Sequence, residues 1–342
     1  MKRLLIILGA VLAAATPAWA DSLVPNDPYY GYEWYGPKLG LPQAWGYSLG
    51  SGSVVVAILD SGVMAKTPDL AGRLRPPLVS PGLALLDGTT CHHGTWVASV
   101  AGMGVNNGVG GAGVGNFAIL PVIVTDWNGR TTDSWSVNGI RMAADAGARA
   151  INVSQYAGDY GRLDVAAAYA KGQGALVFVA AGNGNSKNPM TGYDNLIFVS
   201  GTDSLDRRWD NGPGQEGSAW GPFVDLAAPA WHVLVADPTL PNGYGLGDGT
   251  SFSAPFAAGA AALAWSINPL LAPDEVYAIL KETAVDLGTP GWDEVFGWGR
   301  MDIGAVAERA SQTAGVPEPA TLGLLAAGLV LWGAGRRVTR PL

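Results

Sequence analysis

The chain has one cysteine, Cys91, and three histidines among its 342 residues. A single cysteine excludes an intrachain disulfide, so packing or another constraint, such as a metal, must stabilise the fold. Charged residues make up 14% of the chain and apolar residues 48%, which is too hydrophobic for a disordered protein. Glycine and proline interrupt the apolar stretches too often for a protein with several membrane spans.

Basic residues are also scarce, since 20 Lys and Arg face 28 Asp and Glu and leave a formal net charge of -8. No basic patch with interleaved aromatic residues is present, and binding to a phosphate backbone depends on such a patch. We therefore expect no nucleic-acid partner. No internal repeat and no break in composition divides the middle of the chain.

Residues 1–20 have the features of a signal peptide. Lys2 and Arg3 precede an apolar stretch over residues 4–15, and Ala18-Trp19-Ala20 fits the small-residue rule for signal peptidase. The sequence predicts export, with signal peptidase as a processing partner.

Residues 313–342 form a second terminal segment, in which Pro317-Glu318-Pro319 precedes an apolar run over residues 320–335 and a basic end. One interpretation is a tail anchor, although the apolar run is slightly short to span a bilayer. The segment also resembles the PEP-CTERM sorting signal of Gram-negative bacteria. That resemblance implies transient anchoring in the inner membrane, removal of the tail by an exosortase-type enzyme, and a location in the cell envelope, at the outer surface or in the extracellular matrix.

Uninterrupted apolar runs alternate with helix-like segments over residues 21–312. Continuous rather than alternating apolar runs are typical of strands buried on both faces, as in a parallel sheet covered by helices. We predict an α/β fold, a three-layer α/β/α domain with a mostly parallel central sheet. The expected strands are 54–59, 118–124, 150–153, 175–180 and 196–200, and the expected helices are 95–102, 133–146, 162–171, 253–267, 273–283 and 303–310.

The segment 249–255, Gly-Thr-Ser-Phe-Ser-Ala-Pro, places Ser251 at the start of an Ala-rich helix. Free backbone N–H groups converge there, which suits an oxygen that becomes negatively charged. Two interpretations are open for this segment alone: Ser251 is a nucleophile, or it only caps the helix.

Three further residues stand where sites form in parallel sheets, at strand ends and helix starts. Asp60 and Asn183 follow strands, where turn formation is their common role, and His93 opens a helix. Peptide hydrolysis by a serine needs a base, a carboxylate that orients it, and an oxyanion donor. These three residues supply one of each to Ser251.

The other histidines are weaker candidates for the base. We expect His92 in a loop or rim and His232 as a partly buried structural residue. Consecutive residues rarely bind one ion and no helical His-x-x-x-His pair is present, so no zinc site is expected at Cys91-His92-His93, where Cys91 is predicted to be an inert loop thiol.

The order Asp, His, Ser and the motifs Leu-Asp-Ser-Gly (59–62), His-Gly-Thr (93–95) and Gly-Thr-Ser (249–251) resemble those of subtilases. The resemblance covers about residues 26–310 and is strongest to the thermitase branch, through Pro-Gln-Ala-Trp (42–45) and Thr-Pro-Asp-Leu (67–70). An α/β-hydrolase is excluded, because that fold needs a histidine after its serine.

The resemblance implies an exported serine endopeptidase acting on proteins or peptides. Asp60 would orient His93, and His93 would act as general base and then general acid. Ser251 would form the acyl-enzyme, while Asn183 and the Ser251 backbone N–H would bind the oxyanion.

The expected substrate strands are Ser154, Gln155 and Tyr156 on one side and Ala180, Ala181 and Gly182 on the other. Subtilases usually have Ser-x-Gly on the first of these strands. Tyr156 in place of the glycine, or a one-residue bulge before Gly158, would reshape the pocket for the residue that precedes the scissile bond. Substrate preference therefore does not transfer from the family.

Residues 105–111 resemble the high-affinity calcium loop of subtilases. The implied ligands are the side chains of Asp27, Asp69 and Asn107 and the carbonyls of Val105, Val109 and Gly111, a set of oxygens that suits Ca²⁺. The alternative is a flexible Asn-Gly turn. Bound calcium would supply the constraint that disulfides do not.

The family resemblance begins within a few residues of Ala20, so we expect no inhibitory propeptide of the usual size. This expectation and the altered substrate strand motivate an alternative function, a catalytically weakened subtilase that serves as a binding or structural protein of the envelope. The intact set of Asp60, His93, Asn183 and Ser251 argues against that alternative.

Overall fold

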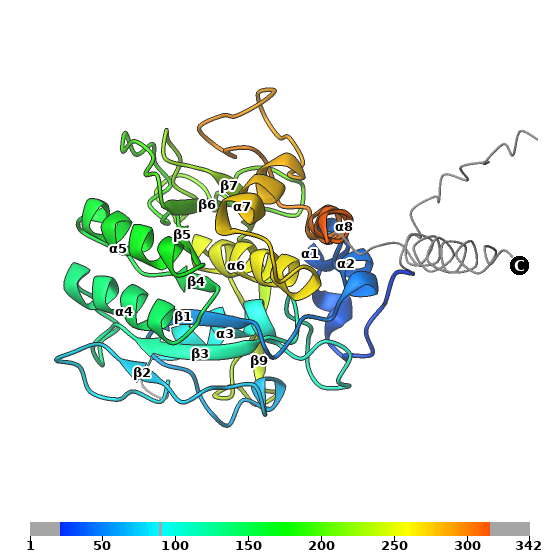
Figure 1. The fold of residues 1–342 in the computed structure, drawn as a ribbon, viewed down its shortest axis with the longest axis horizontal. Coiled ribbons are helices and arrows are strands. Elements are labelled where there is room, and N and C mark those ends of the chain that lie inside the picture. The colour runs from blue at the N-terminus through cyan, green and yellow to red at the C-terminus, as the bar shows by residue number, and fades with distance from the viewer. Residues whose placement is uncertain (1–20, 89–90, 315–342) are drawn as a thin grey trace, which may run out of the picture.

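The computed structural model describes residues 21–88 and 91–314, so the predicted signal peptide and nearly all of the predicted sorting segment lie outside the described residues. Seven parallel strands form the central sheet in the order β2-β3-β1-β4-β5-β6-β7 (Figure 1). The prediction of an α/β fold with a mostly parallel sheet is confirmed. The seven strands are β1 (Val55–Asp60), β2 (Leu78–Val79), β3 (Ala118–Ile123), β4 (Ala150–Val153), β5 (Leu176–Ala180), β6 (Leu196–Thr202) and β7 (Leu226–Pro229).

A hairpin and eight α-helices complete the described part of the chain. The hairpin joins β8 (Val233–Ala236) to β9 (Tyr244–Gly247). The helices are α1 (Tyr35–Lys38), α2 (Leu41–Tyr47), α3 (His93–Gly102), α4 (Asp133–Asp145), α5 (Tyr160–Gly172), α6 (Thr250–Ile267), α7 (Pro273–Glu282) and α8 (Ile303–Thr313), with short 3-10 turns at Tyr30–Tyr32 and Pro68–Leu70.

Helices cover both faces of the sheet. Successive residues of a strand point to opposite faces. On β1, Val56 and Ile58 pack in the core with α3 and α6, whereas Ala57 and Leu59 pack with α4 and α5. Because both faces are buried, the strands need apolar residues at every position, which explains the continuous runs in the sequence.

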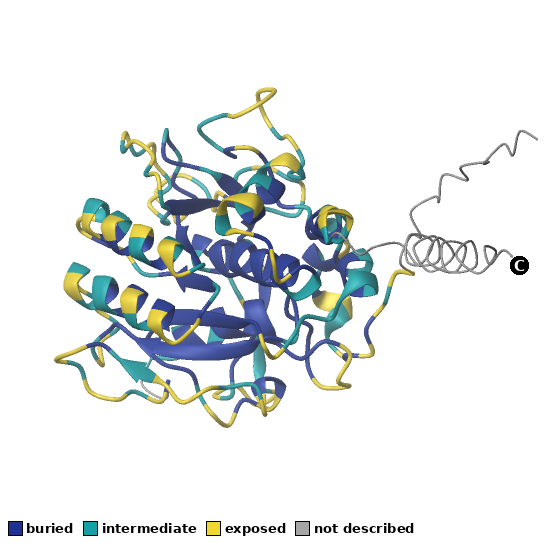
Figure 2. Cartoon of the chain, in the orientation of Figure 1, coloured by how far each residue is buried: buried dark blue, intermediate teal, exposed yellow. Residues whose placement is uncertain are grey.

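Helix α6 is buried on nearly all sides, as Figure 2 shows. A helix that is apolar all around is typical of such a central position. Its small residues permit close packing: a Cβ at Gly259 would lie 2.6 Å from the Val114 Cβ. Across the described residues, no helix has both the length and the apolar character needed to cross a bilayer.

Several details differ from the sequence expectations. Helix α6 begins at Thr250 rather than at residue 253, so Ser251 lies inside its first turn. The expectation that His232 is partly buried is wrong. His232 is exposed and has a φ of 48°, because it lies in the turn before β8, where its backbone N–H donates to Asp248 Oδ1 at 2.6 Å.

Candidate active site

Asp60 and His93 form a close pair at the carboxyl edge of the sheet, where β1 ends and α3 begins. Asp60 Oδ2 lies 2.8 Å from His93 Nδ1, the aspartate side chain is fully buried, and the imidazole is a quarter exposed. A Cβ at position 94 would lie 2.3 Å from the Gly62 carbonyl oxygen. Only glycine therefore permits this close approach of α3 to β1, which explains the Gly that follows His93.

The two charges of this pair stabilise each other. Burial raises the pKa of Asp60, but the His93 charge and the hydrogen bonds to the carboxylate outweigh it, so the pKa lies below its usual value. Burial lowers the pKa of His93, but the charge and hydrogen bond of Asp60 raise it by more, so the pKa lies above its usual value. Asp60 is therefore ionised at neutral pH and can only accept a hydrogen bond. This assigns the proton of neutral His93 to Nδ1 and leaves Nε2 free to act as a base.

Ser251 is held from its backbone side. Pro255 has no N–H to donate to the Ser251 carbonyl, four residues earlier in α6. Ser154 Oγ fills this vacancy by donating to that carbonyl at 2.8 Å, and Asn152 Nδ2 donates in turn to Ser154 Oγ at 2.8 Å. The strand β4 and the start of α6 are thus locked together at Ser251.

The Ser251 hydroxyl donates to the Ser154 carbonyl oxygen at 3.4 Å, and among the described residues it makes no hydrogen bond to His93. The next residue, Phe252, has its ring centre 6.4 Å from that of His93, so the serine and the histidine lie on facing segments. Catalytic hydrogen bonds are often long or absent without substrate.

Asn183 follows β5 and reaches the start of α6. Its Oδ1 accepts from the Thr250 N–H at 3.0 Å and from Thr250 Oγ1 at 2.8 Å. This orientation fixes the opposite end of the amide, Nδ2, as a free donor. The Ser251 N–H lies in the first helical turn, where backbone donors have no partner within the helix. Thr250, which our sequence analysis did not select, therefore positions Asn183, and its place directly before the serine is the only sequence signal for this role.

Two of the expected substrate residues, Gln155 and Tyr156, are neighbours in the chain but lie in different surroundings. Gln155 Nε2 lies 3.2 Å from His93 Nδ1. Since Nδ1–H is itself a donor, Gln155 Nε2 cannot donate to it, and the Gln155 amide instead acts on the neighbouring Asp60 carboxylate, where it helps to lower the pKa of Asp60. Tyr156 is 77% exposed and points away from the core.

A cavity of ≈ 400 Å³ opens beside Asn183. Tyr156 and Tyr160 line one part of it, with their rings edge-to-face at 6.2 Å. The predicted substrate residues Ala181 and Gly182 line it as well, together with residues 183–184 and 186–190 and with Ala219. The structure therefore brings Tyr156, Ala181, Gly182 and Asn183 together around one space, next to Ser251.

The predicted calcium loop folds around two buried carboxylates. Asp27 is 5% exposed and accepts N–H donors from three consecutive residues of the loop, at 2.7, 2.9 and 3.0 Å, from Asn106, Asn107 and Gly108. Asp69 is fully buried and accepts from the Gly104 N–H at 3.0 Å and from Asn107 Nδ2 at 2.9 Å. The structure thus places Asp27, Asp69 and Asn107 together.

The remaining expected ligands are less closely placed. The Val105 carbonyl accepts from Asn116 Nδ2 at 3.3 Å, the Gly111 N–H donates to Asp69 at 3.1 Å, and Val109 is exposed. Within the described residues, no group of three or more His, Cys, Asp or Glu side chains is arranged to hold a metal ion. The donor chemistry nevertheless fits calcium, because two buried carboxylates from other segments meet the Asn107 amide at the loop, and among the described residues no basic side chain forms an ion pair with either carboxylate.

A third carboxylate, Glu33, lies near this loop and was missed by our sequence analysis. It is 1% exposed, and its Oε1 accepts from the Ala112 N–H at 2.7 Å. Burial and the charges of Asp27 and Asp69 raise its pKa well above the usual range.

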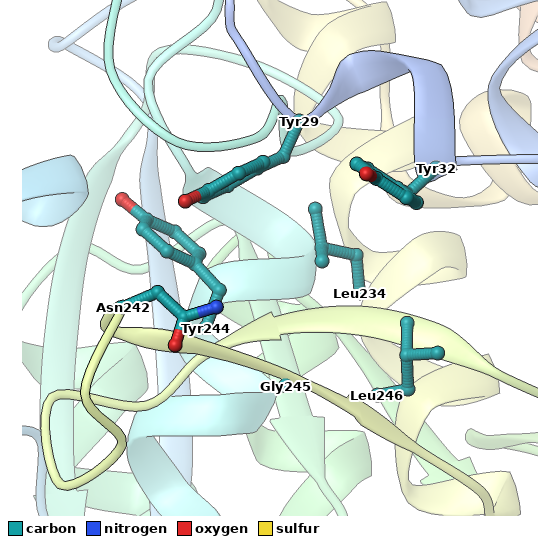
Figure 3. Close-up of a pocket in the computed structure, with 7 residues that line it drawn as sticks. All are labelled: Tyr29, Tyr32, Leu234, Asn242, Tyr244, Gly245 and Leu246. Carbon is teal, nitrogen blue, oxygen red and sulfur yellow. The ribbon is translucent and has the colours of Figure 1, made fainter.

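A second cavity, of ≈ 300 Å³, lies beside the loop (Figure 3). Tyr29 and Tyr244 pack edge-to-face in its wall with ring centres 5.0 Å apart, and Tyr244 Oη donates to Asp69 Oδ2 at 3.2 Å. None of its lining residues is among the expected catalytic or substrate-binding residues. The tyrosine pair thus supports the loop rather than the catalytic pair.

A seven-stranded parallel sheet carries the Asp60–His93 pair at its carboxyl edge, and Ser251 lies in the first turn of α6. Residues 51–299 match the family model described as "Subtilase family". The chain therefore belongs to the subtilases, the subtilisin-like serine proteases, whose substrates are proteins or peptides.

Several characterised proteases are similar to the chain. It is 38% identical over 250 residues to thermitase of Thermoactinomyces vulgaris, covering 70% of this chain and 84% of thermitase. It is 33% identical over 267 residues to a subtilisin of Bacillus pumilus, covering 75% and 91%. It is also 33% identical over 293 residues to the halolysin-like extracellular serine protease Nep of Natrialba magadii, covering 82% of this chain and 52% of Nep.

Solved structures agree on the fold. A protease of Pseudoalteromonas arctica PAMC 21717 superposes with a TM-score of 0.68 at 27% identity, covering 84% of this chain and 100% of that one. A lanthipeptide protease superposes with a TM-score of 0.72 at 22% identity, covering 84% and 99%, a likeness of fold alone.

Proposed function

We propose that this subtilase is an exported serine endopeptidase that cleaves peptide bonds through an acyl-enzyme on Ser251. The observation that carries the proposal is the 2.8 Å contact between Asp60 and His93 at the sheet edge where Ser251 and Asn183 also lie. Motif, order along the chain and family membership agree with this assignment. No comparison favours the catalytically weakened alternative.

In the proposed reaction, His93 Nε2 takes the proton of Ser251 Oγ as that oxygen attacks the scissile carbonyl carbon. Asn183 Nδ2 and the Ser251 N–H donate to the resulting oxyanion. His93 then protonates the leaving amine, and water attacks the acyl-enzyme by the reverse sequence of proton transfers. Asp60 keeps the proton of neutral His93 on Nδ1 and stabilises the imidazolium that forms.

The substrate would extend between Ser154–Tyr156 and Ala180–Gly182. Its side chain before the scissile bond would enter the cavity beside Asn183, since that cavity adjoins the proposed oxyanion site. The proposed calcium site, with Asp27, Asp69 and Asn107 as side-chain ligands and the carbonyls of Val105, Val109 and Gly111, would stabilise the fold and take no part in the chemistry.

Export and sorting are further parts of the proposal. The signal-peptide features of residues 1–20 and the PEP-CTERM-like features of residues 313–342 support them. Mass spectrometry of envelope material from a host with an exosortase-type enzyme should find chains that end near Pro319. Full-length chains alone would contradict sorting.

Cleavage of an unfolded protein substrate tests the proposed activity. The purified full chain is incubated with calcium and reduced, alkylated casein, and the fragments are identified by mass spectrometry. Wild type should produce new peptide termini, and the Ser251→Ala variant, which only removes one hydroxyl, should produce none. Equal fragmentation by both proteins, or none by folded wild type, would contradict the proposal.

A further inference from the structure

The cavity beside Asn183 has one formally charged side chain among its lining residues, all of which the structure describes. This residue is Lys187. The rest of the lining is neutral, with tyrosines on one part of the wall and Pro189 and Met190 on another. A side chain that enters the cavity therefore passes apolar and aromatic surface and meets a single cationic group.

Lys187 is paired with Glu294, which comes from a distant part of the chain. Lys187 Nζ lies 2.5 Å from Glu294 Oε2, and the two side chains are 53% and 38% exposed. Two backbone contacts hold the segments in place: the Asn188 N–H donates to the Trp220 carbonyl at 2.7 Å, and the Gly221 N–H donates to the Glu294 carbonyl at 2.8 Å. Glu294 itself does not line the cavity.

The two residues of this ion pair differ in their relation to the cavity that would hold a substrate side chain. The ammonium group belongs to a residue of the cavity wall, and the carboxylate neutralises it from outside the wall. Lys187 lines the cavity and Glu294 does not, so an acidic group in the cavity would compete with Glu294 for the ammonium, whereas a basic group would have no carboxylate in the cavity wall to pair with. Both partners are partly exposed, so screening limits the effect to a modest one.

We propose that Lys187 is a specificity-determining residue that lets the cavity accept an acidic side chain before the scissile bond, and that Glu294 sets the strength of this preference. The substrate class is peptides with Glu at that position, in preference to Lys or Arg. This inference rests on the proposed function and deepens it.

Three peptides that differ only in the residue before the scissile bond test the proposal. That residue is Glu, Gln or Lys, and Gln serves as the neutral reference of similar size. kcat/KM is measured at low ionic strength for wild type and for the variants Lys187→Gln and Glu294→Gln. Lys171→Gln is the matched control, since it breaks the 2.5 Å ion pair between Lys171 and Asp274. Lys171 lies near the C-terminal end of α5, whereas the cavity residue Tyr160 lies at its N-terminal end.

Wild type should cleave the Glu peptide faster than the Lys peptide. Lys187→Gln should lower the Glu-to-Gln ratio of kcat/KM about fivefold, and Glu294→Gln should raise it about fivefold, as expected for a partly screened charge pair. Lys171→Gln should change no ratio. Ratios that stay within twofold of wild type in both cavity variants would overturn the proposal.

The same experiment distinguishes a failure of the proposed charge preference from a failure of the proposed protease function. If the Gln peptide is cleaved but the ratios do not respond, the charge preference is wrong and the proposed protease function stands. If folded, calcium-loaded wild type cleaves none of the three peptides, the proposed function fails, and the preference fails with it.

Discussion

The Asp60–His93 pair and the predicted calcium loop both involve buried carboxylates, but they balance the charge in different ways. Asp60 faces His93, whose imidazole would become positively charged in the proposed reaction. Asp27 and Asp69 face backbone and amide N–H donors, and in the described part of the chain no basic side chain forms an ion pair with either of them. Arg73 donates to the Asp69 backbone carbonyl, and its charge acts on Asp69 without forming an ion pair with the carboxylate.

This difference indicates what each region needs from outside. A buried charge without a compensating charge is costly, even when it is hydrogen-bonded. In the proposed function the Asp60–His93 pair balances its own charge, whereas a bound cation would balance the charges of Asp27 and Asp69. Changes at Asp60 should therefore affect turnover with little effect on stability, and changes at the loop should do the reverse.

Asp60→Asn should cause the largest loss of activity of the changes considered. An asparagine amide donates to Nδ1, so the proton of His93 moves to Nε2 and the base is lost. We expect kcat to fall about 10⁴-fold, as in other serine proteases with this change. Peptide hydrolysis measures the loss, and thermal unfolding should show a melting temperature close to that of wild type. A loss of less than tenfold would contradict the assigned role.

Asn183→Ala should cause the next largest loss, because it removes one donor to the oxyanion. Such donors are worth about 10²- to 10³-fold in kcat. Thr250→Val is the informative companion, since it keeps the amide but removes one of the two bonds that orient it. Its loss in kcat should be smaller. An equal or larger effect of Thr250→Val would mean that Asn183 is not the main donor.

Calcium removal should lower the stability of the fold at the predicted calcium loop. At calcium concentrations about 100-fold above Kd, binding contributes about 2.7 kcal/mol, or roughly 5–10 °C in melting temperature for a domain of this size. Chelation of wild type should lower the melting temperature by this amount, and Asp69→Asn should be insensitive to chelation. A wild-type melting temperature that does not change with chelator would exclude the Asp27 and Asp69 site.

Gln155→Leu should cause the smallest loss of activity and tests how the Gln155 amide acts on the Asp60–His93 pair. Activity requires neutral His93, and its raised pKa places the loss of kcat/KM, as pH falls, above pH 6.5. Without the Gln155 bond, the pKa of Asp60 rises, the carboxylate holds the imidazolium more tightly, and this acid limb moves to higher pH. We expect kcat to fall less than tenfold.

A pH profile of kcat/KM measures this shift. Tyr156→Ala is the control, because Tyr156 lines the cavity and changes substrate affinity without contacting the pair. An acid limb that is unchanged in Gln155→Leu would show that the amide does not act through Asp60.

The sequence predicted the parts that are local. Continuous apolar runs located five strands of the sheet, β1 and β3 to β6, and short motifs selected Asp60, His93, Asn183 and Ser251. The strands that were missed, β2 and β7 to β9, have two to four residues each, a length at which the periodic signal is weak.

Residues whose roles depend on distant partners were not predicted. Thr250 acts on Asn183, 67 positions earlier, and Gln155 acts on Asp60, 95 positions earlier. Lys187 and Glu294 meet only after three loops have packed together. Such contacts follow from tertiary packing, and a single sequence carries no local pattern for them.

The most direct test of the central claim is labelling with a fluorophosphonate probe followed by peptide mapping. The probe reacts with a serine activated by a neighbouring base. Folded, calcium-loaded wild type should become labelled at neutral pH on Ser251 alone, and Asp60→Asn should label far more slowly. Absence of label on Ser251, or equal labelling of the Ser251→Ala variant, would contradict the account.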